Sequence, residues 1–332
     1  MINFSIISLF SGAGGLDLGF KNAGFKTIWA NEYDKTIWDT FKYNFPDVEL
    51  NTQNITDVES KYIPNSIGLI GGPPCQSWSE AGSGRGINDS RGKLFYDYIR
   101  ILKEKQPKFF LVENVVGILA KKHNEAFNNF LLEFKNANYN ISCKLLDAND
   151  YGVPETRKRV IIVGYHNSIN KTFVFPTPEK YKPTLKDAIY DLPPAVSAKD
   201  KNKSNGYLEI PNHEYMNGSF STMYMSRNRV RSWDEPSFTI QAGGRHAPIH
   251  PQAPKMVFVE KDKYIFAKGY ENQYRRLSVR ECARIQTFPD SFVFKYNNIS
   301  DGYKMIGNAV PVNLAFHIAK KIMKDLENYN EY

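Results

Sequence analysis

Residues 4–15 read FSIISLFSGAGG, an apolar run that ends in a glycine-rich turn. The run carries no charged residue and is typical of a buried strand. Gly12, Gly14 and Gly15 let backbone N–H groups approach a ligand at the carboxyl end of that strand. This stretch predicts the first strand of an α/β fold, followed by a ligand-binding loop and a helix over residues 16–23.

The first half of the chain continues this alternation of strands and helices. Further apolar runs predict strands over residues 25–30, 67–70, 108–112, 141–146 and 160–165. A helix is predicted over residues 34–45, with Asp34 as its N-cap. Another helix has an apolar stripe at helical spacing, formed by Phe127, Phe130, Leu131 and Phe134. This alternation predicts a mostly parallel sheet with helices on both faces.

The second half of the chain has a different character. Five prolines fall within residues 176–194, and residues 199–206 are rich in Asn, Lys, Ser and Gly. Such a composition predicts an irregular segment of loops and short strands. Order returns at Ser278, which forms the pattern of a helix-capping box with Glu281.

A final amphipathic helix is predicted over residues 310–326. A regular first half, an irregular middle and a regular tail indicate that the tail packs back on the first half. We therefore expect two domains: an α/β domain of residues 1–170 and 300–332, and a smaller irregular domain of residues 171–299.

Composition limits the class of protein. The chain has 332 residues, a formal net charge of +8 and a pI near 9.1, which favours a polyanionic partner. Its three cysteines, Cys75, Cys143 and Cys282, form no CxxC pair, so we expect a reducing cytosol and no structural zinc. The start of the sequence has no signal-peptide pattern, and no stretch is apolar enough to predict a membrane span.

Cys75 is the strongest candidate for a reactive group. It lies in Gly71-Gly72-Pro73-Pro74-Cys75-Gln76-Ser77, directly after a predicted strand. A free cysteine is usually a small buried hydrophobe. Two successive prolines, however, restrict the backbone and present the next residue in a defined position. This frame favours a positioned nucleophile.

The glycine-rich turn predicts a nucleoside-like ligand. Glu32 ends the second predicted strand, where an acidic residue typically accepts hydrogen bonds from ribose hydroxyls. The dinucleotide fingerprint is broken, because its third glycine position holds Asp17. A nucleoside without phosphates therefore fits better than a dinucleotide. The alternative is an ordinary strand–helix turn.

Two further groups follow or precede predicted strands. Glu113-Asn114 follows the strand over residues 108–112, where side chains line the ligand crevice of such sheets. Arg157-Lys158-Arg159 precedes another strand. The alternatives are a surface carboxylate for Glu113 and a solvated charge run for the arginines.

Together these residues resemble the motifs of the DNA cytosine-5 methyltransferase family. Six motifs occur in the family's order: Phe10–Gly15, Gly72–Gln76, Glu113–Val115, Arg157–Arg159, Arg276–Glu281 and Gly307–Pro311. Each motif alone is weak, and six in order are highly specific. The chain is especially similar to the HaeIII-type modification enzymes, which methylate GGCC, and residues 225–231 of the variable region support that similarity.

The resemblance implies a Rossmann-like, S-adenosylmethionine-dependent methyltransferase domain with a mostly parallel sheet, plus a smaller irregular target-recognition domain. It implies methyl transfer to C5 of a flipped-out cytosine in double-stranded DNA, without a metal. The resemblance to type II modification enzymes also implies a location in the bacterial cytosol. We expect the protein to act as a monomer. Its cognate restriction endonuclease would be a functional partner and need not bind it.

The resemblance also assigns site residues. Catalysis is assigned to Cys75, Glu113, Arg157 and Arg159. The cofactor site is assigned to Phe10, Gly12, Ala13, Gly14, Gly15, Glu32, Tyr33, Asn54, Ile55, Pro74, Leu94, Asn308 and Val310. DNA contacts are assigned to Ser77, Arg227, Arg229, Arg231 and Arg245. Arginine is suited to bidentate contact with guanine, although phosphate contact or plain surface charge is the alternative for each.

Two positions depart from the family pattern. Gln53-Asn54-Ile55 stands where Gly-Asp-Ile is usual, so either Asn54 or Asp57 would contact the cofactor adenine. Glu155 stands where the family has Gln. The alternative functions are an RNA cytosine-5 methyltransferase acting on transfer RNA and a catalytically inactive DNA-binding module on the same fold. The broken glycine fingerprint disfavours a nicotinamide oxidoreductase.

Overall fold

The computed structural model describes residues 4–74 and 90–329. Its main feature is a seven-stranded sheet with the strand order β3-β2-β1-β4-β5-β7-β6. The strands are β1 (Ser5–Leu9), β2 (Lys26–Asn31), β3 (Glu49–Asn51), β4 (Gly68–Gly71), β5 (Phe109–Val115), β6 (Tyr139–Asp147) and β7 (Lys158–His166). The six strands predicted from the sequence are present, and the short β3 was not predicted.

The sheet is mostly parallel, as predicted. Strands β1 to β5 are parallel to one another, whereas β7 runs antiparallel to both β5 and β6. The order reverses at β1, because β2 and β3 extend the sheet to one side and β4 and β5 to the other. Ligands of open α/β sheets bind outside the carboxyl ends of the strands at such a reversal.

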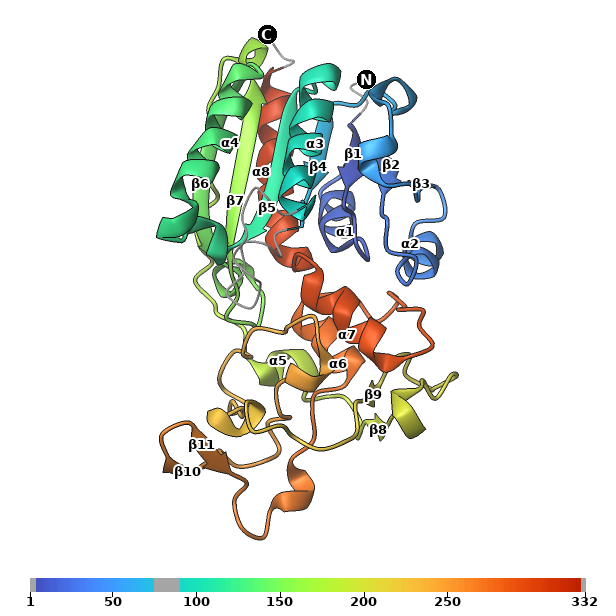
Figure 1. The fold of residues 1–332 in the computed structure, drawn as a ribbon, viewed down its shortest axis with the longest axis vertical. Coiled ribbons are helices and arrows are strands. Elements are labelled where there is room, and N and C mark those ends of the chain that lie inside the picture. The colour runs from blue at the N-terminus through green and yellow to red at the C-terminus, as the bar shows by residue number, and fades with distance from the viewer. Residues whose placement is uncertain (1–3, 75–89, 330–332) are drawn as a thin grey trace.

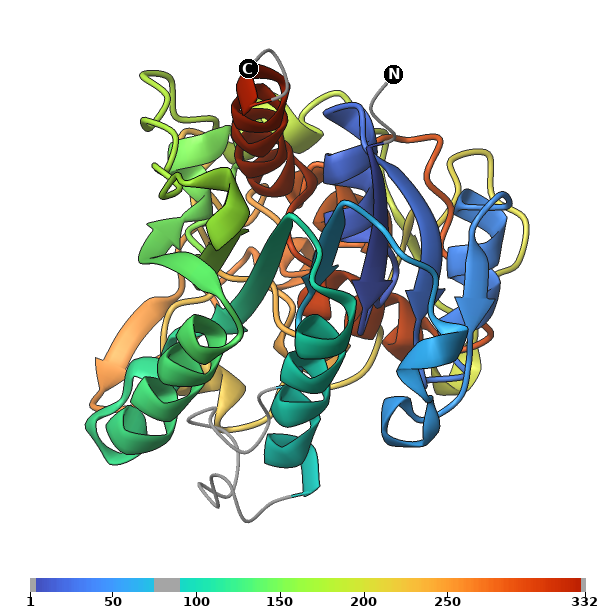
Figure 2. The same ribbon diagram turned by 90° about the horizontal axis from the view of Figure 1, so that it is seen from above.

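Helices cover both faces of the sheet. Ile6 and Ile7 are both fully buried but join different cores, because successive side chains of a strand point to opposite faces. The core around Ile6 includes α1 (Gly15–Asn22) and α8 (Val312–Tyr329). The core around Ile7 includes α3 (Ser90–Lys105) and α4 (Asn124–Asn136). Figure 2 accordingly shows α8 on one side of the sheet and α3 and α4 on the other.

The second helix begins later than the sequence predicts. We expected it to start with Asp34 as its N-cap, but α2 spans Trp38–Asn44. The Asp34 carboxylate instead accepts a hydrogen bond from Thr36 N at 3.0 Å and forms an ion pair with Lys304 at 2.9 Å. The polar side chain therefore stabilises a turn before the helix and a contact with the far end of the chain.

The irregular second half lies below the sheet in Figure 1. Its helices are short: α5 (Leu185–Ile189), α6 (Val279–Ile285) and α7 (Ile299–Asn308). Its strands pair in two small sheets, β8 (Val196–Ser197) with β9 (Glu214–Tyr215), and β10 (Val257–Glu260) with β11 (Lys263–Ile265). The predicted capping box at the start of α6 is confirmed, because Ser278 and Glu281 bond to each other's backbone N–H.

One hydrophobic core joins this lower part to the sheet domain. It contains Ala30 and Phe41 together with Leu277, Ile299 and Tyr303. The two parts therefore share buried apolar surface next to the carboxyl end of β2. None of the helices in the described segments is both long enough and apolar enough to span a bilayer.

Candidate active site

The glycine-rich loop after β1 has the geometry of an open cradle. Gly12 has φ +56°, and no heavy atom of the described residues lies within 4 Å of the position that a Cβ would take there. The next glycines are tightly packed instead. A Cβ on Gly14 would lie 2.2 Å from the Phe45 ring, and one on Gly15 would lie 2.4 Å from the Val310 carbonyl oxygen. Gly12 thus faces free space, while Gly14 and Gly15 let the loop pack closely.

Glu32 lies beside this cradle, directly after β2. Its Oε2 accepts from Gly12 N at 2.9 Å, and its Oε1 accepts from Asp34 N at 2.7 Å. Burial raises the pKa of the Glu32 carboxyl above its ordinary value, while the two backbone N–H groups act in the opposite direction. Tyr33, the next residue, exposes 68% of its surface. A partly buried acceptor beside an exposed ring fits a ribose and an adenine.

The other predicted cofactor residues surround the same edge of the sheet. Asn54 Oδ1 accepts from Thr56 N at 3.4 Å, and this bond caps a short turn that buries Ile55. Val310 is buried under the glycine loop, whereas Asn308 is exposed. The open Gly12 cradle and the Glu32 carboxylate fit S-adenosylmethionine, and these residues would hold its nucleoside part.

The catalytic candidates Glu113 and Arg159 form an ion pair. Glu113 lies near the carboxyl end of β5, and Arg159 lies near the start of the neighbouring β7. Arg159 Nε is 2.9 Å from Glu113 Oε1, and both side chains are nearly buried. The Nε–H does not point along this contact, so it makes no regular hydrogen bond within the described residues. The contact is therefore an ion pair without the geometry of a hydrogen bond.

The segment that leads to Cys75 is attached beside this pair. Asn114 Nδ2 donates to the Pro73 carbonyl oxygen at 3.3 Å. A Cβ on Gly72 would lie 3.2 Å from Glu113 Oε2, so the loop backbone passes close to the carboxylate. Cys75 and Ser77 themselves lie outside the described residues. Their attachment point is therefore next to Glu113.

Arg157 binds backbone segments that the sequence did not identify as its partners. Its guanidinium is buried and donates to three backbone carbonyls: Ile240 at 3.0 Å, Gly307 at 2.8 Å and Ala309 at 2.9 Å. These acceptors come from segments that are remote in the sequence, so local pattern carries no signal for them. Arg157 fastens the start of β7 to the irregular half and to the loop before α8.

The four arginines assigned to DNA contacts differ in their surroundings. Arg227 and Arg245 are exposed. Arg229 is buried and donates to the carbonyls of Tyr224 and Met223. Arg231 is partly buried, pairs with Glu235 at 2.8 Å and stacks on Phe238. Arg227 and Arg245 thus have free approach to a partner, while Arg229 and Arg231 are held by internal contacts.

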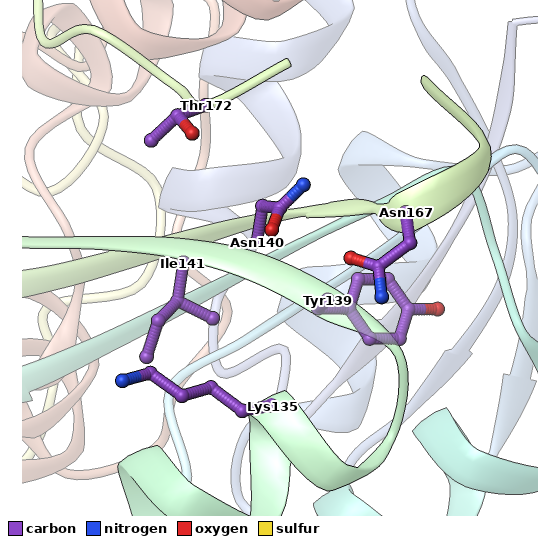
Figure 3. Close-up of a pocket in the computed structure, with 6 residues that line it drawn as sticks. All are labelled: Lys135, Tyr139, Asn140, Ile141, Asn167 and Thr172. Atoms are coloured by element: carbon purple, nitrogen blue, oxygen red, sulfur yellow. The ribbon is translucent and has the colours of Figure 1, made fainter. Parts of the chain in front are cut away.

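A shallow pocket of about 350 Å³ lies elsewhere, at the outer edge of the sheet. Figure 3 shows its lining residues on β6, the end of α4 and the segment after β7: Lys135, Tyr139, Asn140, Ile141, Asn167 and Thr172. None of the residues predicted for catalysis or cofactor binding lines this pocket. The candidate active site is instead the carboxyl edge of the sheet, where Gly12, Glu32 and the Glu113–Arg159 pair lie.

Comparison with known proteins agrees with this geometry. A family model described as C-5 cytosine-specific DNA methylase matches residues 4–324. Type II methyltransferase M.FnuDI of Fusobacterium nucleatum is 58% identical over 326 residues, covering 97% of this chain and 94% of that protein. Type II methyltransferase M.MthTI of Methanothermobacter thermautotrophicus is also 58% identical, covering 98% and 99%.

A solved structure agrees in three dimensions. It comes from an Escherichia coli prophage and is described as a DNA modification methyltransferase. It matches with a TM-score of 0.75 and 26% identity, covering 97% of this chain and 99% of that chain. The family match spans the cradle at Gly12, the Glu113–Arg159 pair and the clamp at Arg157. The chain therefore belongs to the C-5 cytosine-specific DNA methylase family and is a DNA cytosine-5 methyltransferase.

Proposed function

We propose that the chain is the modification enzyme of a type II restriction-modification system and methylates C5 of a flipped-out cytosine in GGCC. The observation that supports this most is the buried Glu113–Arg159 pair, which lies next to the loop that leads to Cys75. A carboxyl group and a guanidinium side by side can hold the polar edge of a pyrimidine. The specificity for GGCC rests on the resemblance to HaeIII-type enzymes.

In this proposal Cys75 is the nucleophile. Its thiolate adds to C6 of the cytosine. The C5–C6 π pair then forms a C4–C5 double bond, and the C4–N3 π pair moves to N3, which takes a proton from Glu113 in its protonated, carboxylic-acid form. Arg159 holds the pyrimidine O2. C5 thereby becomes nucleophilic. S-adenosylmethionine, when bound, would supply an electrophilic methyl group and would be left as S-adenosylhomocysteine. A water removes the C5 proton, the thiolate of Cys75 leaves C6, the C5–C6 double bond is restored, and N3 returns its proton to Glu113.

We assign target recognition to the irregular region of residues 171–299. A cytosine inside a duplex is unreachable, so the base must leave the stack, at roughly a few kcal/mol. The exposed Arg227 and Arg245 are suited to guanine edges in the major groove. The same region shares a core with the sheet domain, which would hold it over the crevice.

Covalent trapping tests the chemical step. Duplex DNA carrying 5-fluorocytosine at the target should form a denaturation-resistant adduct with the wild-type enzyme and cofactor, because fluorine cannot leave C5 as a proton does. Cys75→Ser should form no adduct and transfer no methyl group. Cys143→Ser is the matched control, because Cys143 is exposed on β6, and this variant should behave as wild type.

Bisulfite sequencing of DNA from cells that express the enzyme tests the site. Protected cytosines should fall within GGCC.

The two experiments have separate contradicting outcomes. In the trapping experiment, absence of an adduct with the wild-type enzyme would exclude the covalent mechanism. Protected cytosines in another sequence context would exclude GGCC while leaving the cytosine-5 chemistry intact.

A further inference from the structure

Two buried side chains bind the backbone of a single residue of the irregular region, one at its N–H and the other at its carbonyl oxygen. Glu155 Oε1 accepts from Ile240 N at 2.6 Å, and Arg157 Nη1 donates to the Ile240 carbonyl oxygen at 3.0 Å. Glu155 is 0% exposed and Arg157 is 1% exposed. Ile240 is therefore attached to the segment that runs directly into β7.

Further hydrogen bonds join the same two segments. Thr156 N donates to Ser237 O, and Ser237 N donates to Pro154 O, both at 2.9 Å. Thr239 Oγ1 donates to Thr156 O at 2.6 Å. Residues 237–240 thus lie along residues 154–157 as a short ladder, with Glu155 and Arg157 at its end.

The ladder connects the two functional parts of the proposed enzyme. Towards the sheet, Arg157 is two residues from Arg159, which pairs with Glu113. In the other direction, Ile240 is followed by the loop of residues 241–245, where Gln241 and Arg245 are exposed. A displacement of this loop would therefore be transmitted to the start of β7.

The charge of Glu155 is also part of this arrangement. Its carboxylate is 3.5 Å from Arg157 Nη1 and compensates a guanidinium that is otherwise bound only by carbonyls. Burial lowers the pKa of Arg157 to about 10 and raises the pKa of Glu155, while each charge acts on the other in the opposite direction, so the two charged forms support each other. Glu155 Oε2 has no hydrogen-bond partner within the described residues. The glutamine of the family pattern would anchor Ile240 but would not neutralise Arg157.

We propose that Glu155 is a positioning residue that couples the DNA-facing loop of residues 241–245 to the catalytic Glu113–Arg159 pair. It acts through Ile240 and Arg157 and does not touch the substrate. Discrimination between DNA sites and the rate of methyl transfer then depend on the same buried contact. This inference rests on the proposed roles of Glu113 and Arg245.

The test compares variants on the preferred DNA site and on singly altered sites. Glu155→Ala should lower kcat on the preferred site and the ratio of kcat/KM between preferred and altered sites, each by about 3- to 30-fold. Glu155→Gln should restore most of the discrimination, because the amide oxygen can accept from Ile240 N.

Glu214→Gln is the matched control. Glu214 is a buried acid of the irregular region that bonds to Ser204 and Asn205, away from the ladder. It should lower thermal stability without changing the discrimination ratio. If Glu155→Ala fails to fold, Thr239→Val decides, because it removes only the bond to Thr156 and should lower the ratio by about 2- to 5-fold.

If Glu155→Ala has the same kcat and the same discrimination ratio as wild type, the coupling is overturned and Glu155 is only a structural residue. An unchanged ratio in Thr239→Val would do the same where Glu155→Ala is unfolded. Failure of the proposed function is distinguishable, because wild type itself would then form no 5-fluorocytosine adduct.

Discussion

Asp17 is a charged residue in the core beneath the cofactor loop. Its side chain is fully buried in the first turn of α1, where it accepts hydrogen bonds from the hydroxyls of Ser8 and Thr27, both at 3.1 Å. Burial raises its pKa from 3.8 to about 6, and the two hydroxyls only partly oppose this. The carboxyl group therefore binds its proton more tightly in the folded protein than in the unfolded chain.

Asp17→Asn should stabilise the protein at neutral pH. A carboxyl with a raised pKa favours folding at low pH, and that contribution is lost as the pH rises from about 4 to about 6. Asparagine retains an acceptor and a donor for the two hydroxyls but carries no charge. We expect the free energy of unfolding to rise by roughly 1–3 kcal/mol at pH 7.5, with the difference vanishing near pH 4.

Urea unfolding between pH 4 and pH 8 measures this difference. The exposed Asp39→Asn is the control and should change stability little at either pH. If Asp17→Asn is less stable than wild type at pH 7.5, the charged carboxylate of Asp17 does not destabilise the folded protein, and the prediction is wrong.

At the scale of single residues, the sequence predicted which side chains lie together better than it predicted the backbone groups that they bind. Glu113 and Arg159 were expected in one site, and they form an ion pair. The strand ends that present them are encoded locally by apolar runs. The clamp at Arg157 was not predicted, because its acceptors at Ile240, Gly307 and Ala309 become neighbours only when the chain folds.

At the scale of elements, the packing of α1 on α8 depends on Gly19. A Cβ at this position would lie 2.4 Å from Ala315 Cβ and 2.7 Å from the Val312 carbonyl oxygen. Gly19→Ala should therefore lower the free energy of unfolding by about 1–3 kcal/mol, although alanine is the better helix former. Chemical denaturation of the two proteins measures the difference.

Lys21→Ala on the exposed side of the same helix is the control, and we expect a change within about 0.5 kcal/mol. Equal or greater stability of Gly19→Ala would show that α1 and α8 have room to separate. The two variants together distinguish close helix packing from helix propensity.

Strands were easier to predict than helix ends. A strand that is buried on both faces is a continuous apolar run, so β1 and β5 are visible in the sequence. The start of α2 was predicted four residues too early, at Asp34 instead of Trp38. The reason is the ion pair of Asp34 with Lys304, a partner from α7 that no local pattern reveals.

At the scale of the whole molecule, the arginines of the irregular half should separate into two groups. Arg227→Ala and Arg245→Ala remove exposed side chains. Loss of a bidentate guanine contact should weaken binding to the preferred site by about 1–3 kcal/mol and relax discrimination at that base. Arg229→Ala should also destabilise the fold, because its guanidinium is bound to the carbonyls of Tyr224 and Met223.

Binding of each variant to GGCC and to singly altered sites, at several salt concentrations, separates base contacts from phosphate contacts. Loss of a phosphate contact should weaken binding to all sequences and flatten the dependence on salt. At least two of Arg227, Arg229 and Arg245 should alter the preference among sites. Uniform weakening by all three would place base reading elsewhere in residues 171–299.

The packing of α8 against α1 has a consequence for synthesis. About 290 residues separate the end of α1 from the start of α8, so at roughly 5–20 residues per second the ribosome needs on the order of 15–60 s to deliver the partner. During that time Phe20, which is fully buried in the finished protein, has no cover from α8. A nascent chain therefore stays prone to aggregation until translation is almost finished, and slower translation should reduce the yield of native enzyme.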